Sequence, residues 1–236
     1  MGSANFFSGG IYTFKSNITS YFSLRDQNEI LIEENIRLRE RLEGVKTLAN
    51  STAIDSGILP LEYKYFSSEV INNNYSKTKN TLTINKGSND SIKIDMGVIS
   101  SKGIIGIVNK VSKNYATVQS ILNTNSQINA RLKNSSHFGS LEWDTNEPNI
   151  VQLNEVNRLA PVKVGDTIIT GGKSTIFPDG ILIGTIKEFK IGENDNYDLD
   201  VLLFNDMTNL KHVYVIENTN AREILELEKG DADAEQ

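Results

Sequence analysis

The stretches GIIGIVNKV at residues 103–111 and GILIGTIKEF at residues 180–189 follow one pattern. Each has a glycine, apolar residues, a second glycine, and then a run with the β-branched character of a strand. Glycine within a strand permits a bulge or a close approach between two backbones, so a structural role is expected for these glycines. The repeat therefore predicts an internal duplication in which each half of the chain forms a small closed barrel.

Further strand patterns surround this repeat on both sides. Short runs of alternating or β-branched residues recur about every 8 to 12 residues, separated by turn-forming residues, which is typical of antiparallel sandwiches and barrels. They fall into two sets of six. The predicted strands are 69–72, 81–85, 98–100, 104–111, 116–122, 128–132, 139–143, 150–153, 167–170, 181–191, 198–204 and 213–217.

A helical pattern precedes the strands. Apolar residues and asparagines alternate at steps of three and four over more than three heptads, which is the pattern of a coiled-coil seam. Position a is occupied by tyrosine, asparagine and leucine, and position d by leucine and valine. The predicted self-association residues are Tyr21, Leu24, Asn28, Leu31, Asn35, Leu38, Leu42 and Val45.

The two asparagines of the seam indicate what the partner helix is. Asparagine at position a weakens a coil but can pair with its own counterpart across a parallel dimer, which fixes register. Asn28 and Asn35 therefore favour a parallel homodimer or a higher self-assembly. The alternative is one amphipathic helix folded back on its own domain, although such a helix normally has a wider apolar face.

These patterns predict a mainly β protein with an N-terminal coiled-coil helix and two six-stranded antiparallel β-barrel domains. Residues 51–57 and Pro60 mark a hinge, and the last residues are acidic and polar. We expect strands to be exchanged between the barrels at some point. The predicted divisions are a vector remnant at 1–4, the coiled coil at 5–48, the hinge at 49–65, barrels at 66–145 and 146–222, and a frayed acidic tail at 223–236.

Composition excludes several classes of function. A net charge of −6, from 24 basic and 30 acidic side chains, argues against sequence-independent binding of nucleic acid. The chain has no cysteine, so disulfides and thiolate zinc sites are excluded. No run is long enough to span a membrane, but the vector-like first residues suggest a truncation, so a membrane anchor is expected to be missing here.

Candidate catalytic and cofactor motifs are weak. Residues 171–175, GGKST, resemble the end of a phosphate-binding loop, but Thr167 stands where the first glycine belongs and Pro178 follows where a helix should begin. His137 and His212 lie outside any two-histidine metal motif. We therefore predict no cofactor and no metal.

Nucleophile and carboxylate patterns are equally uninformative. No segment supplies a recognisable activated serine with an oxyanion loop. The carboxylate pairs Asp195 with Asp198 and Asp231 with Asp233 lie in turn or tail contexts, where solvated side chains are the ordinary interpretation. We predict no catalytic residues and no enzyme.

The order of features resembles one known family. A heptad helix containing EENIRLR (33–39) precedes GVISSKGIIGIV (97–108), GDTIITGG (165–172) and FPDGILIG (177–184). Together these segments resemble the extracytoplasmic part of the bacterial rod shape-determining protein family MreC, over nearly the whole chain. The single N-terminal membrane span of that family is absent, so anchoring follows from the resemblance alone.

That resemblance implies a non-enzymatic scaffold of the cell-elongation complex with chymotrypsin-like barrels. It implies the periplasmic region of a single-pass inner-membrane protein that self-associates and activates the elongation penicillin-binding transpeptidase, with MreD and MreB as further partners. The partner surface is not readable from sequence, since surfaces need the fold. Two alternatives stay open: a degenerate double-barrel hydrolase acting on cell-wall material, and a plain ligand-binding β module.

Overall fold

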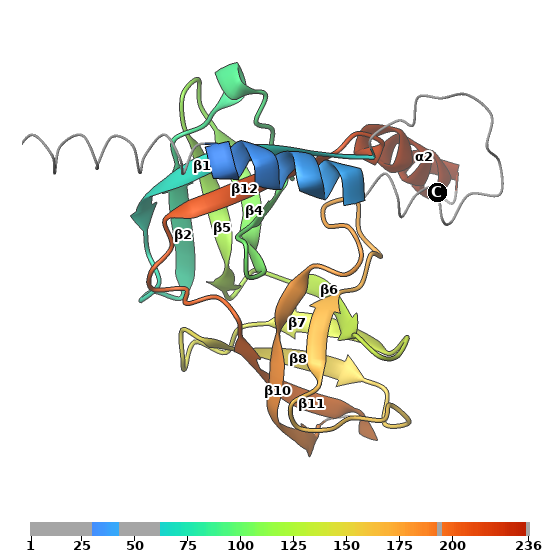
Figure 1. Ribbon diagram of the computed structural model, residues 1–236. Coiled ribbons are helices and arrows are strands. Elements are labelled where there is room, and N and C mark those ends of the chain that lie inside the picture. The colour runs from blue at the N-terminus through green and yellow to red at the C-terminus, as the bar shows by residue number, and fades with distance from the viewer. Residues whose placement is uncertain (1–29, 43–61, 193–194, 235–236) are drawn as a thin grey trace, which may run out of the picture. The chain divides into compact units, whose positions relative to one another are not determined.

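The protein was analysed as a computed structural model, which describes residues 30–42, 62–192 and 195–234 (Figure 1). Residues 30–42 are helical and form part of a separate compact unit from the β-rich remainder. All twelve predicted strands are present, and most ends shift by one to three residues. They are β1 (Tyr63–Asn73), β2 (Lys79–Ile84), β3 (Gly97–Ile99), β4 (Ile104–Val111), β5 (Ala116–Asn123), β6 (Ile128–Leu132), β7 (Phe138–Glu142), β8 (Ile150–Val156), β9 (Thr167–Thr170), β10 (Leu182–Ile191), β11 (Tyr197–Leu203) and β12 (His212–Asn218). The exception to the small shifts is β1, which begins at Tyr63, six residues before its predicted start and inside the predicted hinge 49–65.

The strands close into two antiparallel barrels of six strands, which confirms the predicted fold class. Barrel 1 has the order β1-β12-β3-β4-β5-β2, and barrel 2 has the order β10-β11-β8-β7-β6-β9. Barrel 2 is continuous in sequence and lies between β5 and β12. Barrel 1 is therefore completed by the last strand of the chain.

This division differs from the predicted boundary at residues 145 and 146. Strands β6 and β7 belong to barrel 2, and β12 belongs to barrel 1. The pairing of Tyr63 with Asn218 joins residues at opposite ends of the β region. Local alternation of apolar residues marks a strand but not its distant partner, so sequence patterns could not place this boundary.

The two barrels have the same ring order once equivalent strands are aligned. Starting from β12, barrel 1 runs β12-β3-β4-β5-β2-β1, and starting from β6, barrel 2 runs β6-β9-β10-β11-β8-β7. The repeated stretches fall on the equivalent strands β4 and β10. The first half of the duplication, β1 to β6, gives five strands to barrel 1 and its sixth strand, β6, to barrel 2. The second half, β7 to β12, gives five strands to barrel 2 and its sixth strand, β12, to barrel 1.

The second glycine of each repeated stretch has the same structural role. A Cβ at Gly106 would lie 2.1 Å from the Gln119 carbonyl oxygen, and one at Gly184 would lie 2.1 Å from the Leu202 carbonyl oxygen. Register shifts occur nearby in both strands. Glycine is needed because the neighbouring strand approaches too closely for any side chain.

The core of each barrel follows from the alternation along the strands. Side chains pointing inward are fully buried, for example Leu82, Ile84 and Val118 in barrel 1 and Leu153 and Ile168 in barrel 2. Burial of each such side chain stabilises the fold by about 1.5–3 kcal/mol. The apolar, β-branched character of the strands is thus explained by two separate cores.

The first glycine of the repeat joins the barrels. Gly103 has a φ of +153°, and a Cβ there would lie 2.3 Å from the Leu182 carbonyl oxygen of barrel 2. Nearby, Phe177 is buried, and a Cβ at Gly97 would lie 2.7 Å from its Cε1 atom. Glycine at these positions therefore allows the two barrels to approach each other closely.

A buried asparagine in the β11–β12 connection also links the barrels. Asn205 donates from Nδ2 to the Ile104 carbonyl oxygen at 2.9 Å, and its Oδ1 accepts the Ser100 hydroxyl at 2.5 Å. Buried polar groups stabilise a fold when they are hydrogen-bonded, and each of these has its partner. The connection between barrels is therefore specific as well as tightly packed.

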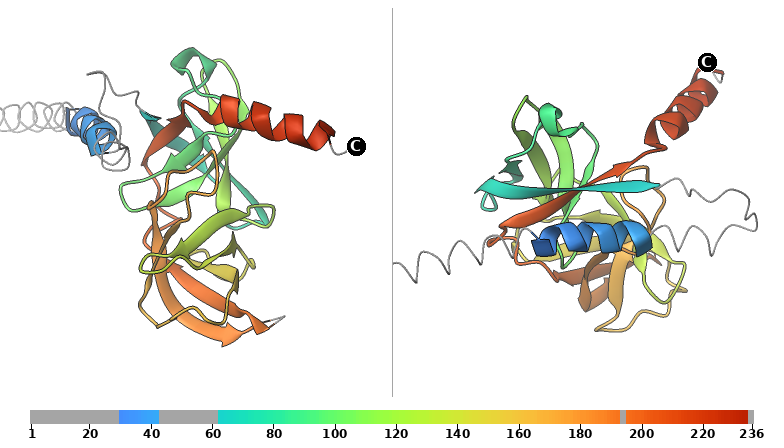
Figure 2. Two further views of the ribbon diagram at one scale, coloured as in Figure 1. Left: turned by 90° about the vertical axis from the view of Figure 1, so that its right-hand side faces the viewer. Right: turned by 45° about the horizontal axis from the view of Figure 1, so that its top comes forward.

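The C-terminal residues are helical, so the prediction of a frayed tail is wrong. Helix α2 (Ala221–Ala234) leaves barrel 1 beside β1 and β12 (Figure 2). Arg222 pairs with Glu226 at 2.8 Å across one turn, and Glu223 lies in the first turn, where its charge favours the helix dipole. Helix propensity of Ala, Leu, Glu and Lys outweighs the polar composition on which the prediction relied.

Candidate interaction surfaces

The seam residues that the structure describes are exposed to solvent on the surface of their helix. Leu31, Leu38 and Leu42 expose 55%, 53% and 58% of their surface. Asn35 donates from Nδ2 to the Leu31 carbonyl oxygen of its own helix at 2.7 Å. Apolar residues at these spacings are available to a second helix, and pairing through them stays a prediction. The remaining seam residues Tyr21, Leu24, Asn28 and Val45 lie outside the described residues.

A second apolar surface lies at one end of barrel 2. We call it the distal apolar end and define it by Leu159, Val164, Phe189, Ile191 and Tyr197. Leu159, Val164 and Ile191 are 86%, 64% and 56% exposed. Apolar groups gathered this way on a surface commonly mark an interaction site, whereas single exposed apolar residues are ordinary.

Neighbouring elements bring these residues to the same end. The loop from β8 to β9 carries Leu159 and Val164, and Arg158 in this loop forms an ion pair with Asp195 in the β10–β11 turn. Ile191 lies opposite Tyr197 in the β10–β11 register. The loop and the hairpin therefore form one surface.

The hairpin aromatics are held in a defined arrangement. The Phe189 and Tyr197 rings contact edge to face, with centroids 5.5 Å apart at 82°. A register shift between Ile186 and Glu188 precedes them, after which β10 is exposed along its remaining length. The shift places Phe189 opposite Leu199, which is buried, so Phe189 and Ile191 lie on the core side of the hairpin, where β10 is exposed toward its end.

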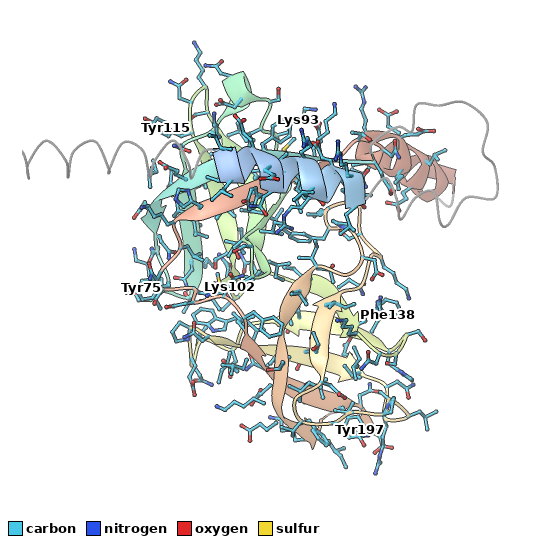
Figure 3. The ribbon with its side chains drawn as sticks, in the orientation of Figure 1. Tyr75, Lys93, Lys102, Tyr115, Phe138 and Tyr197 are labelled. Carbon is cyan, nitrogen blue, oxygen red and sulfur yellow. The ribbon has the colours of Figure 1, made fainter. Side chains whose placement is uncertain are left out.

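This end of barrel 2 is remote from barrel 1. Leu182, at the start of β10, contacts barrel 1 through Gly103, whereas Ile191 is the last residue of the same strand. A ten-residue strand is about 30 Å long. Figure 3 shows Tyr197 at the far end of barrel 2 from β1 and β12.

The histidines do not form a catalytic triad in the described part of the chain. His137 Nδ1 lies 3.1 Å from the Ser135 hydroxyl, which is two residues away on the same loop. His212 is on β12, opposite Glu69 in the strand register. Among the described residues no carboxylate is hydrogen-bonded to either imidazole, so neither histidine has the acidic group that orients a catalytic base.

The other candidate motifs have structural surroundings. Residues 171–175 belong to an irregular loop between β9 and β10, and the next element is a strand. Asp195 pairs with Arg158, and Asp198 lies opposite Lys190 in the β10–β11 register. Asp231 and Asp233 are in α2. Within residues 30–42, 62–192 and 195–234, no group of acidic or histidine side chains could hold a metal ion.

Of the helices that the structure describes, none combines the length and the apolar character needed to cross a bilayer.

Comparison with known proteins identifies the family. The sequence profile described as rod shape-determining protein MreC, barrel core, matches residues 70–217. The chain belongs to the MreC family. The resemblance predicted from the glycine-rich segments is thereby confirmed, and the match covers the residues of both barrels except the first part of β1 and the last residue of β12.

Individual relatives agree with this assignment. The chain is 27% identical to the cell shape-determining protein MreC of Listeria monocytogenes over 217 residues, which are 89% of this chain and 72% of that protein. It is 29% identical to MreC of Bacillus subtilis over 200 residues, which are 79% of this chain and 64% of that protein. The relatives are named for determining cell shape.

Solved structures share the fold. A structure of MreC from Listeria monocytogenes has a TM-score of 0.63 at 24% identity, covering 88% of this chain and 95% of the other. A complex between penicillin-binding protein PBP2 and MreC from Helicobacter pylori has a TM-score of 0.54 at 17% identity, covering 67% and 99%. At these identities the likeness concerns the fold alone.

The distal apolar end was not predicted from the sequence. Phe189 and Ile191 were assigned to a strand, and alternation alone suggests that one face of such a strand points into a core. The register shift keeps them on the side of the buried Leu199, but the end of β10 is exposed, which alternation does not reveal. Among the surfaces that the structure describes, the distal apolar end and the exposed part of the helical seam are the strongest candidates for an interaction site.

Proposed function

We propose that this chain is a non-enzymatic scaffold of the bacterial cell-elongation complex. In this proposal the chain self-associates through its N-terminal helix and binds the elongation penicillin-binding transpeptidase outside the cytoplasm. The region would belong to a single-pass inner-membrane protein, with MreD and MreB as further members of the assembly. Family membership and the complex of a structural neighbour with PBP2 support this function.

The distal apolar end is the observation that carries the proposal. It offers aromatic and branched side chains together, at the end of barrel 2 opposite barrel 1, where a partner has access. Interfaces depend on a few such anchors that become fully desolvated on binding. Charged side chains around it, including Arg158, Asp195 and Lys190, would form the polar rim.

Activation would be a shift of population in the partner. A scaffold favours the active conformation of an enzyme only if it binds that conformation more tightly than the inactive one. Pairing of two chains through the helix would present two barrel units and raise the effective concentration of the binding surface. The exposed Leu31, Leu38 and Leu42 support such pairing.

Binding to the transpeptidase of the same organism tests the proposal. We expect Ile191→Ser to raise Kd at least about tenfold, as loss of an interface anchor does. The matched control is Ile94→Ser on barrel 1, because Ile94 and Ile191 expose 57% and 56% of their surface. Biolayer interferometry with both variants gives the comparison. Equal affinities for the two variants and the parent would rule out the distal apolar end as the binding surface.

A further inference from the structure

A groove lies on the outer surface of barrel 2, apart from the distal apolar end. We call it the Phe138 groove, and its volume is about 360 Å³. Sites for small ligands begin at about this size. Its principal lining residues are Gln127, Asn129, Phe138, Gly139, Ser140 and Glu155.

Glycines allow close packing beside the groove and against its aromatic ring. A Cβ at Gly171 would lie 2.1 Å from Asn129 Oδ1 and 2.8 Å from Phe138 Cδ1, so the ring packs directly on the glycine backbone. A Cβ at Gly139 would lie 2.4 Å from the Asn154 carbonyl oxygen. The GGKST stretch, which resembled a phosphate-binding loop, thus supports the wall of this groove.

Lys173 of the same stretch also contacts the ring. Its Nζ atom lies 3.8 Å from the Phe138 ring centroid, within the range of a cation–π interaction. Figure 3 shows Phe138 on the side of barrel 2. The aromatic residue is therefore held in place before any ligand arrives, which reduces the entropy lost on binding.

The polar lining is ordered by a carboxylate. Glu142 Oε1 accepts hydrogen bonds from Gln127 Nε2 at 3.0 Å and from the Ser140 hydroxyl at 3.3 Å. Its Oε2 atom accepts one from Asn154 Nδ2 at 3.5 Å. Asn129 Oδ1 is buried without a hydrogen-bond partner in the described structure, which leaves the amide nitrogen as the donor for the groove.

Glu155 adds an exposed carboxylate at the rim. It has a φ of +62° within β8, next to the register shift between β8 and β11. A bulge at this point directs one side chain away from the regular alternation. The lining therefore combines a flat aromatic ring, amides, a hydroxyl and an acid.

This combination matches a sugar ring. A pyranose has an apolar face of C–H groups that packs on an aromatic ring, and hydroxyls around its edge that both donate and accept hydrogen bonds. Glu142 and Glu155 argue against an anionic ligand. An extended peptide is also disfavoured, because the closed barrel has no unpaired strand edge to which it could add.

We propose that the Phe138 groove binds an N-acetylated amino sugar of the cell-wall glycan. The amide of the N-acetyl group would exchange hydrogen bonds with Gln127 and Asn129, while the sugar ring packs on the face of Phe138 that Lys173 does not cover. This inference rests on the proposed function, which places the barrels beside newly made glycan. It gives the scaffold a second ligand, separate from its protein partner.

Titration followed by ¹H–¹⁵N NMR of the full chain tests this site. The probe is chitobiose, which is uncharged, with cellobiose as the matched sugar that lacks the acetamido group. One sugar held by one aromatic ring and a few hydrogen bonds is expected to have a Kd on the order of 1 mM. Shifts should be confined to the amides of 127–129, 138–140 and 155, and cellobiose should produce weaker ones.

Two variants and one control make the test specific. Phe138→Leu keeps apolar packing on Gly171 but removes the flat ring, and should weaken binding at least tenfold. Glu155→Gln changes an exposed side chain and should weaken it severalfold, even if Phe138→Leu perturbs the fold. Phe189→Leu, an equally apolar change at the distal apolar end, should leave sugar binding unchanged.

The outcomes separate this inference from the proposed function. Absence of shifts at ten times the expected Kd, or shifts that persist in both groove variants, would overturn the sugar site. If Phe138→Leu still binds the transpeptidase, loss of sugar binding concerns the groove alone. If the sugar binds but the transpeptidase does not, the scaffold proposal fails and the sugar site remains.

Discussion

The two barrels have the same ring order but are completed in different ways. Barrel 2 contains six consecutive strands, whereas barrel 1 needs β12, which follows all of barrel 2 in sequence. Pairing of Tyr63 with Asn218 closes a long loop of chain. Contacts of large sequence separation form slowly, because the chain loses loop entropy before the contacts stabilise it. Barrel 2 can therefore form from local contacts. Barrel 1 can close only when β12, which follows the whole of barrel 2 in the sequence, returns to pair with β1 and β3.

The largest expected effect comes from removing the strand that closes barrel 1. Deletion of residues 212–236 removes the partner of β1 and β3, together with Val213, Tyr214, Val215 and Ile216, all buried. At about 1.5–3 kcal/mol for each side chain, the loss exceeds what a small barrel withstands. Amide hydrogen exchange should show barrel 1 unfolded and barrel 2 protected.

A shorter deletion is the control for that experiment. Removing residues 221–236 eliminates α2 but leaves β12 in place. Barrel 1 should then keep its protection. Loss of protection in both barrels after the longer deletion would contradict the view that barrel 2 folds independently.

A smaller effect should distinguish the first glycines of the two repeats. Gly103 and Gly180 both have positive φ, +153° and +91°, but only Gly103 faces a close neighbour, the Leu182 carbonyl oxygen. Gly103→Ala should cost about 3 kcal/mol or more, from backbone strain together with overpacking. Gly180→Ala meets open space and should cost about 1–2 kcal/mol, from strain alone.

Urea denaturation measures this difference as a shift in midpoint at constant slope. A larger shift for Gly103→Ala than for Gly180→Ala would show that the close approach of Gly103 to barrel 2 contributes to stability. Equal midpoints for the two variants would show that the contact at Gly103 does not stabilise the pair of barrels.

The smallest effect concerns the turn before β3 in barrel 1. Asp90 accepts hydrogen bonds from Lys86 Nζ at 2.8 Å and from the Gly87 N–H at 3.1 Å. The Lys86 hydrogen bond, followed by the Gly87 one, lowers the pKa of Asp90. A lowered pKa in the folded state contributes stability that is fully present above the unfolded value of about 3.9 and is lost as the pH falls through the folded value.

Asp90→Asn should therefore destabilise the protein at pH 7 by less than about 1 kcal/mol, as expected for a partly exposed pair. The difference between variant and parent should shrink as the pH falls below the unfolded pKa value of Asp90 toward its lowered folded value. Thermal unfolding at pH 7 and at pH 3, with and without added salt, checks the sign. A difference that grows toward low pH would contradict the conclusion that the ionised form of Asp90 stabilises the fold.

Local patterns predicted most elements of the fold. Alternation of apolar residues located every strand, and the repeated glycines indicated two barrels. The β1–β12 pairing could not be predicted, because strand alternation carries no information about a partner far along the chain. Helix α2 was missed because acidic composition was given more weight than helix propensity.

The candidate surfaces were harder to predict than the fold. The heptad pattern located Leu31, Leu38 and Leu42 on one helix, but the distal apolar end depends on the register shift after Ile186. The Phe138 groove joins residues from β6, β7, β8 and the loop around Gly171. Such a site exists only after the barrel has closed, and no sequence spacing records it.

The point at which the chain enters and leaves barrel 1 has a mechanical consequence. Thr219 donates its backbone N–H to the Glu62 carbonyl oxygen at 2.9 Å, so the chain enters β1 and leaves β12 side by side. Tension between the two ends of the β region would be applied to this one antiparallel pair, and would separate its hydrogen bonds one after another. Barrel 2 lies outside that line of force, so its surfaces would keep their shape while the protein is under load.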